Sequence, residues 1–351
     1  NASKTYKTQP GDELVRKRTR NQQANVKGIF NVGERNKVSV GVEYLADMLS
    51  SPTENISHKT AYTAALFAQD EITITRQLRA LAGVRYLYHE YFKSYATPNV
   101  ALMYGQGGLN VRASYAAGFR APTLSELYAS ETTKSVDRIT IGNLNLKPEK
   151  SDYFSLNAEY AHSRFTVSTN LFYNRIRDMI DYRTIATGEE AKQKYGHEEV
   201  RQRDNVYKAE VRGINVAAQA YLGAGFRIGA GYTHLDTKDD ETGRPIDKSL
   251  RNAANVNAQW SRTWGGYTMN VYLNGRINSE RFSKTYGYAP AYQLWDLNTR
   301  HTFSLSSVIL EPGVGIENLF NYTDDRPYNF NYATLTPGRS VYVSLSIKFK
   351  G

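Results

Sequence analysis

Histidines are the side chains of this sequence best suited to bind a transition metal, because a neutral imidazole offers a ring nitrogen as a ligand. Six are present, at positions 58, 89, 162, 197, 234 and 301. His89, within "YLYHEYF", shares a strand face with Arg85, and His197, within "KYGHEEV", falls in a long polar segment. We therefore retain these two as candidate ligand contacts. An ordinary role on a polar surface is the alternative for each.

Aromatic residues are more frequent in the polar segments of this chain than is usual for loops. Such rings can stack on a flat chelate or grip a hydrophobic ligand. They can also form the aromatic girdle at the edge of a membrane protein. The aromatic residues that we select as candidate ligand contacts are Tyr128, Tyr195, Tyr286, Tyr288, Tyr328 and Phe330.

A basic cluster occupies one polar segment, residues 184–203. Its Arg201 and Arg203, together with Lys192 and Lys194, suit an anionic chelate, and attraction to lipopolysaccharide phosphates is the alternative. Enzymatic chemistry is not indicated, because the sequence has no G-x-S-x-G, H-E-x-x-H or Walker A pattern. With no cysteine there is also no thiolate metal site. We predict neither catalytic residues nor an intrinsic metal or cofactor.

The composition narrows the class of protein. The formal net charge is +10, but lysine and arginine are scattered along the chain, which does not favour nucleic acid as a partner. No run of about 18 apolar residues is present, so a transmembrane helix is not expected. Tyrosine is in excess, with 27 Tyr against 13 Phe and 3 Trp, as suits a surface that is apolar in the middle and wet at both ends.

Strands with one apolar face are the elements that must position these residues. In the final segment "SVYVSLSIKF", Val341, Val343, Leu345, Ile347 and Phe349 alternate with polar residues, so they share one face of an extended strand. About fifteen segments follow this pattern, each near the length of roughly ten residues that a tilted membrane strand needs. We expect the apolar face to contact lipid.

The connections between these segments alternate between short and long. Short turns are predicted at 33–36, 75–78, 105–108, 162–164, 223–225 and 264–266. Long polar connections are predicted at 50–60, 120–148, 184–203, 237–251, 280–291 and 322–337, with a shorter one near 92–95. This alternation is typical of an outer-membrane barrel with periplasmic turns and extracellular loops. The first complete strand is expected at about 20–32, which leaves 1–19 as part of an extracellular loop and 20–349 as membrane strands with their loops.

Three stretches resemble the TonB-dependent outer-membrane receptors. "AAGFRAPTLSELY" (116–128) and "GNLNLKPEKSDYFSLNAEY" (142–160) are similar to the paired boxes of that family, and "GIENLFNY" with "PGRSVYVSLSIKF" is similar to its C-terminal signature. Residues 1–351 together resemble the later part of such a receptor. The residues that match the family motifs are Phe119, Arg120, Ala121, Pro122, Asn143, Asn145, Leu146, Asn318, Leu319, Phe320, Pro337, Gly338, Arg339 and Phe349.

This resemblance implies an all-β fold, a transmembrane antiparallel β-barrel with about 15 of an expected 22 strands in this chain. The plug domain and about seven strands would belong to a missing N-terminal part, which would also contact the TonB complex. Outer-membrane lipid and lipopolysaccharide, and possible contact with a surface lipoprotein, complete the expected partners. The cargo would be a ferric siderophore or haem, with cobalamin as the alternative. Segment 120–148 would be the loop in which haem receptors carry a ligand histidine, and this sequence has none there.

The alternative interpretation of the paired boxes is that their residues shape the backbone and do not contact a ligand. Gly118, Pro122, Asn143 and Asn145 suit a strand exit and a loop return, while Arg120 and Glu126 suit either mutual anchoring or contact with ligand. Two rival classes also fit the alternation: a complete 16-stranded diffusion porin, and an extracellular soluble β-repeat protein. The porin requires one more strand before residue 20, and the soluble protein requires the apolar faces to be buried.

Overall fold

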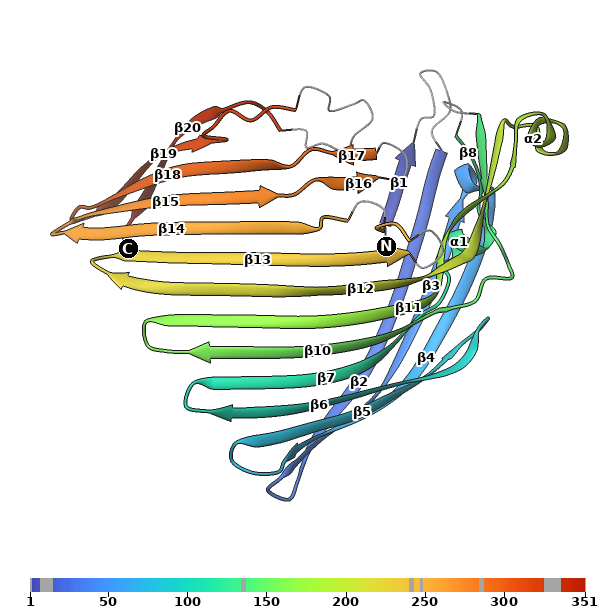
Figure 1. The fold of residues 1–351 in the computed structure, drawn as a ribbon, viewed down its shortest axis with the longest axis horizontal. Helices are drawn as coiled ribbons and strands as arrows, with labels where there is room; N and C mark the ends of the chain where they lie inside the picture. Colours follow the sequence, from blue (N-terminus) through green and yellow to red (C-terminus); the bar gives the residue numbers. More distant parts are fainter. Residues whose placement is uncertain are drawn as a thin grey trace. The chain divides into compact units, whose positions relative to one another are not determined.

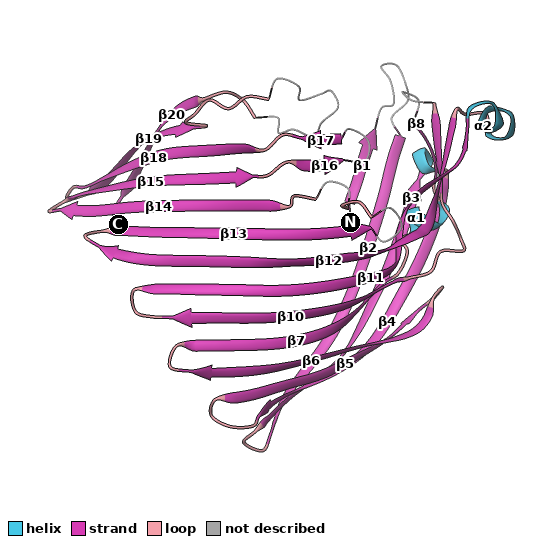
Figure 2. Ribbon diagram, in the orientation of Figure 1, coloured by secondary structure: helices cyan, strands magenta, loops and turns pink. Residues whose placement is uncertain are grey.

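Long antiparallel strands account for most of the chain in the computed structural model, which describes residues 2–6, 15–133, 137–239, 243–246, 249–283, 287–324 and 336–350 (Figures 1 and 2). Fifteen of the described strands have ten or more residues, as the alternation predicts. They are β2 (Val15–Val32), β3 (Asn36–Ser51), β4 (Ile56–Thr73), β5 (Leu78–His89), β6 (Lys93–Gln106), β7 (Leu109–Arg120), β10 (Glu149–Ala161), β11 (Phe165–Thr187), β12 (Glu199–Gly223), β13 (Phe226–Asp239), β14 (Asn252–Trp264), β15 (Tyr267–Asn278), β18 (Tyr292–Ser304), β19 (Val308–Glu317) and β20 (Ser340–Phe349).

Short elements lie in the connections. They are strands β1 (Ala2–Tyr6), β8 (Ser130–Thr133), β9 (Arg138–Ile141), β16 (Arg281–Ser283) and β17 (Gly287–Ala289), the 3-10 helix η1 (Pro52–Glu54), and helices α1 (Leu124–Tyr128) and α2 (Gly188–Tyr195). No helix in the described ranges is both long enough and apolar enough to cross a bilayer.

The chain divides into two compact units. Unit 1 comprises residues 1–103, 113–154 and 174–210, and unit 2 comprises 104–112, 155–173 and 211–351. In unit 1, β2, β3, β4 and β5 pair in chain order, each antiparallel to the next. In unit 2, β13, β14, β15, β18, β19 and β20 pair in the same way. Each of these two runs of strands is thus a meander in which neighbours in sequence are neighbours in the sheet.

All six predicted short turns are confirmed, at 33–35, 75–77, 107–108, 163–164, 224–225 and 265–266, and a seventh lies at 306–307. Gly225 shows why these turns need glycine: its φ is +88°, and a Cβ there would lie 2.0 Å from the carbonyl oxygen of Ser261. We call the end of each long strand next to these turns the turn end, and the opposite end the loop end.

Some predicted boundaries are wrong. β2 begins at Val15 instead of about 20, and residues 2–6, expected as loop, pair with 15–19 as β1. The expected loop 50–60 shrinks to η1 and Asn55, because β3 and β4 continue to Ser51 and from Ile56. Backbone pairing with a neighbouring strand extends these strands beyond the apolar alternation from which the boundaries were predicted. Arg201 and Arg203 consequently lie on β12 and not in a loop.

One face of each meander is apolar and exposed. On β3, β4 and β5 the cross-strand rows Tyr44, Ala64, Tyr88 and Val42, Leu66, Tyr86 lie on this face. The opposite face is polar, and there Arg85 donates to Glu43 over 2.8 Å. Leu66 is 60% exposed and Val343 of β20 is 77% exposed. A soluble sheet would bury such rows, whereas a membrane barrel presents them to lipid.

Aromatic rings gather at the two ends of the apolar face. At the turn end of unit 2, Trp264 stacks on Tyr267 with 5.8 Å between ring centroids, and Tyr267 stacks on Phe303 at 4.9 Å. His301 accepts or donates a 2.6 Å hydrogen bond with the Tyr267 hydroxyl, so it belongs to this cluster. Towards the loop end of unit 1, Tyr62 lies 6.2 Å from Tyr44. Such girdles are characteristic of membrane–water interfaces.

The buried side chains of unit 1 lie mainly beneath its loops. One cluster joins Leu49, Ile56 and Ala61 of β3 and β4 to Leu124 of α1. A second contains Leu127, Leu146 and Ile180, and a third contains Ala186, Ala191 and Val200. Val200 and Ala191 are fully buried. The loop connections are therefore anchored by small apolar cores of their own.

Candidate ligand-binding site in the loops

The two family-like boxes meet at the loop end of β7 and β10. Arg120, the last residue of β7, donates from Nε to Glu149 over 2.7 Å and from Nη1 to Glu126 over 3.0 Å. Glu149, the first residue of β10, also accepts the backbone N–H of Ile180 over 2.8 Å. Arg120 and Glu126 thus anchor one another, which is one of the two roles that the sequence suggested for them. This ion-paired cluster closes the base of the loop between the boxes.

Helix α1 begins the loop between the boxes, with Thr123 and Glu126 forming a capping box. Burial raises the pKa of Glu126, but the bonds from Arg120 and from the Thr123 N–H outweigh it and leave that pKa below its ordinary value. Gly142 packs against the end of α1, where a Cβ would lie 2.6 Å from the Leu127 carbonyl group. The second box therefore needs glycine at this position so that the loop can return beside the helix.

The remaining residues of the paired boxes support this packing. Phe119 packs on Tyr95 with 4.4 Å between ring centroids, and Pro122 and Leu146 are buried. The Asn143 side chain accepts the Asn145 N–H over 2.9 Å, which shapes the turn after Gly142. These contacts agree with the interpretation that the boxes shape the exit from one strand and the return of the loop to the next.

Tyr128 lies in an aromatic and basic cluster at the loop end of unit 1. Its ring is 6.5 Å from that of Tyr91, and the Lys59 ammonium lies 4.3 Å above it. Tyr91 donates to the Thr60 carbonyl over 2.7 Å, and burial, helped by the hydrogen bond with Tyr128, raises the pKa of Tyr91 to about 12. Tyr91 is therefore a neutral donor at physiological pH. Sequence reasoning did not single out Lys59 or Tyr91, although Tyr91 lies only two residues after His89 in "YHEYF".

His89 is packed beside the cluster around Tyr128. It is 6% exposed, its Nδ1 accepts the Tyr91 N–H over 3.1 Å, and its ring lies 5.0 Å from that of Phe92. One ring nitrogen is therefore already used by the protein.

His197, the second candidate histidine, joins two loops of unit 1. Its Nδ1 lies 2.9 Å from Oδ1 of Asp137, and Asp137 also accepts the Glu198 N–H over 3.2 Å. The hydrogen bond from His197 holds the pKa of Asp137 below its ordinary range. Next to this contact, β9 and β12 pair in parallel, with Arg138 opposite Glu199. The histidine thus fastens the β8–β9 hairpin to the loop that contains α2.

We expect Asp137→Asn to loosen this junction, because the amide removes the negative charge that faces His197. Amide hydrogen exchange in Arg138–Ile141 should become several-fold faster, while exchange in β3 stays unchanged. Thr133→Ala, on the other strand of the same hairpin, is the matched control. If the exchange of β9 is unaltered by Asp137→Asn, the contact does not hold the hairpin.

The aromatic and basic candidates of the α2 segment make internal contacts. The Tyr195 ring packs on the cluster around Val200, with the Lys194 ammonium 5.3 Å above it. Arg201 donates to Glu199 over 2.6 Å, and the Arg203 guanidinium lies 3.6 Å above the ring of Tyr182. These two guanidiniums are therefore partly neutralised or shielded by neighbours.

Tyr288 lines a separate pocket at the loop end of unit 2. The pocket has a volume of about 280 Å³ and lies between the connection after β13 and the β16–β17 hairpin. Tyr288 is 57% exposed and its ring lies 5.3 Å from that of Phe282. Arg251 also lines the pocket, with its side chain 69% exposed and 4.0 Å from Asp236. The sequence predicted residues 237–251 and 280–291 as loops, but it did not show that Arg251 and Phe282 would lie around the same pocket as Tyr288.

The C-terminal signature forms a clamp in unit 2. Asn318, 5% exposed, donates to the carbonyls of Tyr322 over 2.6 Å and of Pro337 over 3.0 Å. The Arg339 N–H donates to the Asn321 side chain over 2.8 Å. These bonds position the "PGR" turn, which includes Gly338, against the "NLF" segment, in which the Leu319 N–H donates to Trp295 over 2.6 Å. Phe320 and Phe349 remain exposed on the apolar surface, at 64% and 81%.

Three candidate contacts, Tyr286, Tyr328 and Phe330, lie outside the described residues. Within the described part of the chain, no three histidine or carboxylate side chains are grouped to hold a metal ion. The candidate contacts that are described offer stacking on aromatic rings, hydrogen bonding and attraction of anions by arginine and lysine.

Comparison with known proteins agrees with this architecture. The family described as "TonB dependent receptor-like, beta-barrel" matches residues 2–319. The probable hemoglobin and hemoglobin-haptoglobin-binding protein 4 of Haemophilus influenzae is 30% identical over 120 residues, which are 33% of this chain and 12% of that protein. A mutant of the ferric enterobactin receptor PfeA from Pseudomonas aeruginosa superposes with a TM-score of 0.76 at 20% identity, covering 96% of this chain and 54% of that one. The siderophore receptor PirA from the same organism gives 0.73 at 20% identity, covering 96% and 58%.

The chain thus spans a little over half the length of these two solved structures. The family match covers most of the sequence, and the described strands, turns and exposed apolar face agree with it. It decides against the diffusion porin and the soluble β-repeat protein. The chain belongs to the family of TonB-dependent receptor β-barrels, which are proteins of the bacterial outer membrane.

Proposed function

We propose that this chain provides barrel strands and extracellular loops of a transporter that takes up an iron chelate across the outer membrane. A ferric siderophore is the preferred cargo, haem is the second, and cobalamin is the alternative within the same family. The plug and the contact with the TonB complex would be supplied by the rest of the receptor. In this scheme the strands form a rigid wall, and the loops form part of the binding surface.

We rank a siderophore above haem because both candidate histidines are already engaged by other groups of the protein. His89 is buried and its Nδ1 accepts a backbone N–H, and His197 is held by Asp137. By contrast, Tyr288 and Arg251 are exposed around one pocket. A preformed anionic chelate can be bound by a ring that stacks on it and by a cation, both of which this pocket offers, whereas haem iron needs an axial ligand, and the protein already uses both candidate histidines. A siderophore therefore fits the loop surface better than haem does.

The test compares aromatic, basic and histidine variants in the full-length receptor. Tyr288→Ala and Arg251→Ala should each weaken the binding of a ferric siderophore by about five- to tenfold, because each removes a contact worth roughly 1 kcal/mol. His89→Ala and His197→Ala should change this affinity less than about twofold. Binding is measured by quenching of intrinsic fluorescence, with ferric enterobactin and haem as the two probes.

Phe282→Leu serves as the control for packing in the pocket, because it keeps a large apolar side chain and removes the aromatic ring. Loss of tight haem binding in either histidine variant, with siderophore binding unaffected by Tyr288→Ala, would reverse the order and make haem the leading cargo.

A further inference from the structure

A small hollow opens on the inner face of unit 2, the face opposite the lipid-facing side chains of β20. Its floor is Gly313 of β19, which lies on the opposite face from the exposed Val314. The hollow has a volume of about 60 Å³, enough for a few water molecules or for one carboxylate group. It lies where β15, β18, β19 and β20 run side by side (Figure 1), and the inner-face residues that line it are Tyr272, Asn298, Arg300, Gly313, Tyr342 and Ser344.

Two glycines of β19 let larger side chains lie across the sheet at this point. A Cβ at Gly315 would lie 2.3 Å from the Tyr342 ring and 2.4 Å from Oδ1 of Asn298, so a larger residue would keep these two groups apart. With glycine there, the Tyr342 hydroxyl donates to that Oδ1 over 2.8 Å. A Cβ at Gly313 would lie 2.8 Å from Oγ of Ser344, so this glycine keeps the floor open beside the hydroxyl.

Hydrogen-bond donors converge on the hollow. Because Oδ1 of Asn298 accepts from Tyr342, the amide N–H groups of Asn298 are left for another acceptor. The Ser344 hydroxyl borders the floor, and Arg300 lies opposite Gly313, one row nearer the turn end than Asn298. A guanidinium, an amide N–H and a hydroxyl together match a carboxylate, which accepts hydrogen bonds at both of its oxygens.

The positive charge of Arg300 is not balanced by an acid of the same sheet. Arg300 is exposed, and no carboxylate in the described ranges forms an ion pair with it. Glu311, two residues from Gly313 on β19, is instead bound to Lys348 over 2.6 Å. A concave surface that carries one sign of charge concentrates the field and attracts the opposite charge. The hollow therefore favours an anion.

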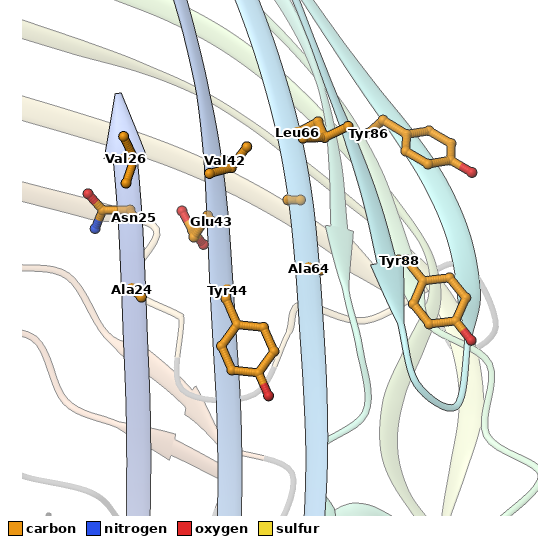
Figure 3. Close-up of a pocket in the computed structure, with 11 residues that line it drawn as sticks. Ala24, Asn25, Val26, Val42, Glu43, Tyr44, Ala64, Leu66, Tyr86 and Tyr88 are labelled. Carbon is orange, nitrogen blue, oxygen red and sulfur yellow. The ribbon is translucent and has the colours of Figure 1, made fainter. Parts of the chain in front are cut away.

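Unit 1 shows the contrasting arrangement. On its inner face the Arg85 guanidinium donates to Glu43 over 2.8 Å, so this charge is balanced within the sheet. Glu43 alternates along β3 with Val42 and Tyr44, which border the apolar groove of about 440 Å³ shown in Figure 3. Arg300 differs from Arg85 in that any carboxylate paired with it comes from outside the described residues.

We propose that this hollow is a carboxylate-binding site in the inner wall of the barrel. Arg300 would bind one carboxylate oxygen or both, and Asn298 and Ser344 would donate to the remaining lone pairs. Two sources bring a carboxylate into the lumen, namely an Asp or Glu side chain of the plug and a small carboxylic acid or carboxylate-bearing chelate. The first source rests on the proposed function, because the plug belongs to the rest of the receptor, whereas the site itself depends only on the inner position of this face.

The test replaces the guanidinium by an amine, which a water-soluble carbodiimide couples to a carboxylate in contact with it. In the purified full-length receptor, Arg300→Lys should form an amide, and peptide mass spectrometry identifies the acid that was joined. A cross-link to one Asp or Glu of the plug would assign the site to the plug. With citrate added as the soluble probe, a citrate adduct at position 300 without a plug cross-link would assign the site to a small carboxylate.

Arg85→Lys is the matched control, because its amine should couple to Glu43, a carboxylate already in place on the inner face. Gly313→Ala puts a methyl group on the floor beside Ser344 and leaves position 300 unchanged. Combined with Arg300→Lys, it should lower the yield of the amide at least about fivefold, the effect of weakening one charge-assisted hydrogen bond.

Three results would overturn the proposal. They are a cross-link from Arg300→Lys to Glu311 alone, no product from Arg300→Lys while Arg85→Lys reacts, and equal yields with and without Gly313→Ala. Heat-modifiable mobility in electrophoresis shows that each variant is folded. Binding of ferric enterobactin at the loops should stay within about twofold of the wild type in every variant, because distant sites act independently. Failure of this site is therefore distinct from failure of the proposed function.

Discussion

Leu345→Arg is expected to lower the free energy of unfolding by about 2–4 kcal/mol, the cost of placing a charged side chain on the lipid face near the middle of a membrane strand. Leu345 is 64% exposed and lies on the same face of β20 as Val343 and Ile347, whereas the neighbouring serines lie on the opposite face. The guanidinium would have to be desolvated or to pull water into the hydrocarbon region. The measurement is reversible unfolding of the refolded receptor in lipid vesicles, followed by tryptophan fluorescence.

Ser346→Arg is the matched control for Leu345→Arg. Ser346 is the next residue of β20 and faces the opposite side, where it lies across from Glu311 of β19. An arginine there should change the stability by less than about 1 kcal/mol, because polar-face substitutions are not exposed to lipid. If the two variants are equally stable, or if a spin label at position 345 is accessible to water and not to bilayer oxygen, the assignment of the lipid face is wrong.

Arg120→Ala is expected to lower the free energy of unfolding of the loop region by about 2 kcal/mol. The change leaves Glu126 and Glu149, whose side chains are 12% and 16% exposed, without their shared cation. Removing one partner of a buried pair costs about 3–5 kcal/mol, and we reduce this value because the Arg120 side chain itself is 42% exposed. Hydrogen exchange of the amides between residues 121 and 149, and of Ile180, measures the effect.

Arg79→Ala is the matched control for Arg120→Ala. Arg79 and Glu71 form an exposed pair at 3.5 Å, so removal of this pair should lower the free energy of unfolding by less than about 1 kcal/mol.

The Arg120 cluster should also weaken in acid. Because the folded pKa of Glu126 is lowered, its contribution is fully present above the ordinary glutamate pKa of about 4.3 and is lost as the pH falls through the lowered value. An unchanged exchange pattern in Arg120→Ala would show that the apolar contacts of Leu127 and Leu146 hold the loop without the ions.

The sequence by itself determined the long strands, the short turns and which side of the alternating segments is apolar. These features are local: alternation has a period of two residues, and a tight turn needs only a few residues such as Gly225. The fifteen long strands and the six short turns could therefore be predicted without knowing which strands pair. The boundaries could not, because β1 and the loop ends of β3 and β4 are held by hydrogen bonds to other strands and not by their own apolar pattern.

The tertiary structure alone decided which distant side chains act together. Arg120 and Glu149 are 29 residues apart and meet because β7 and β10 end side by side, which spacing in the sequence does not show. The same holds for His89, whose burial depends on the turn after β5, and for Tyr288 and Arg251, which share a pocket between two loops. On the apolar face of unit 1, cross-strand register sets Ala64 between Tyr44 and Tyr88. Register depends on pairing over the whole length of the strands, so it becomes definite only when the sheet forms.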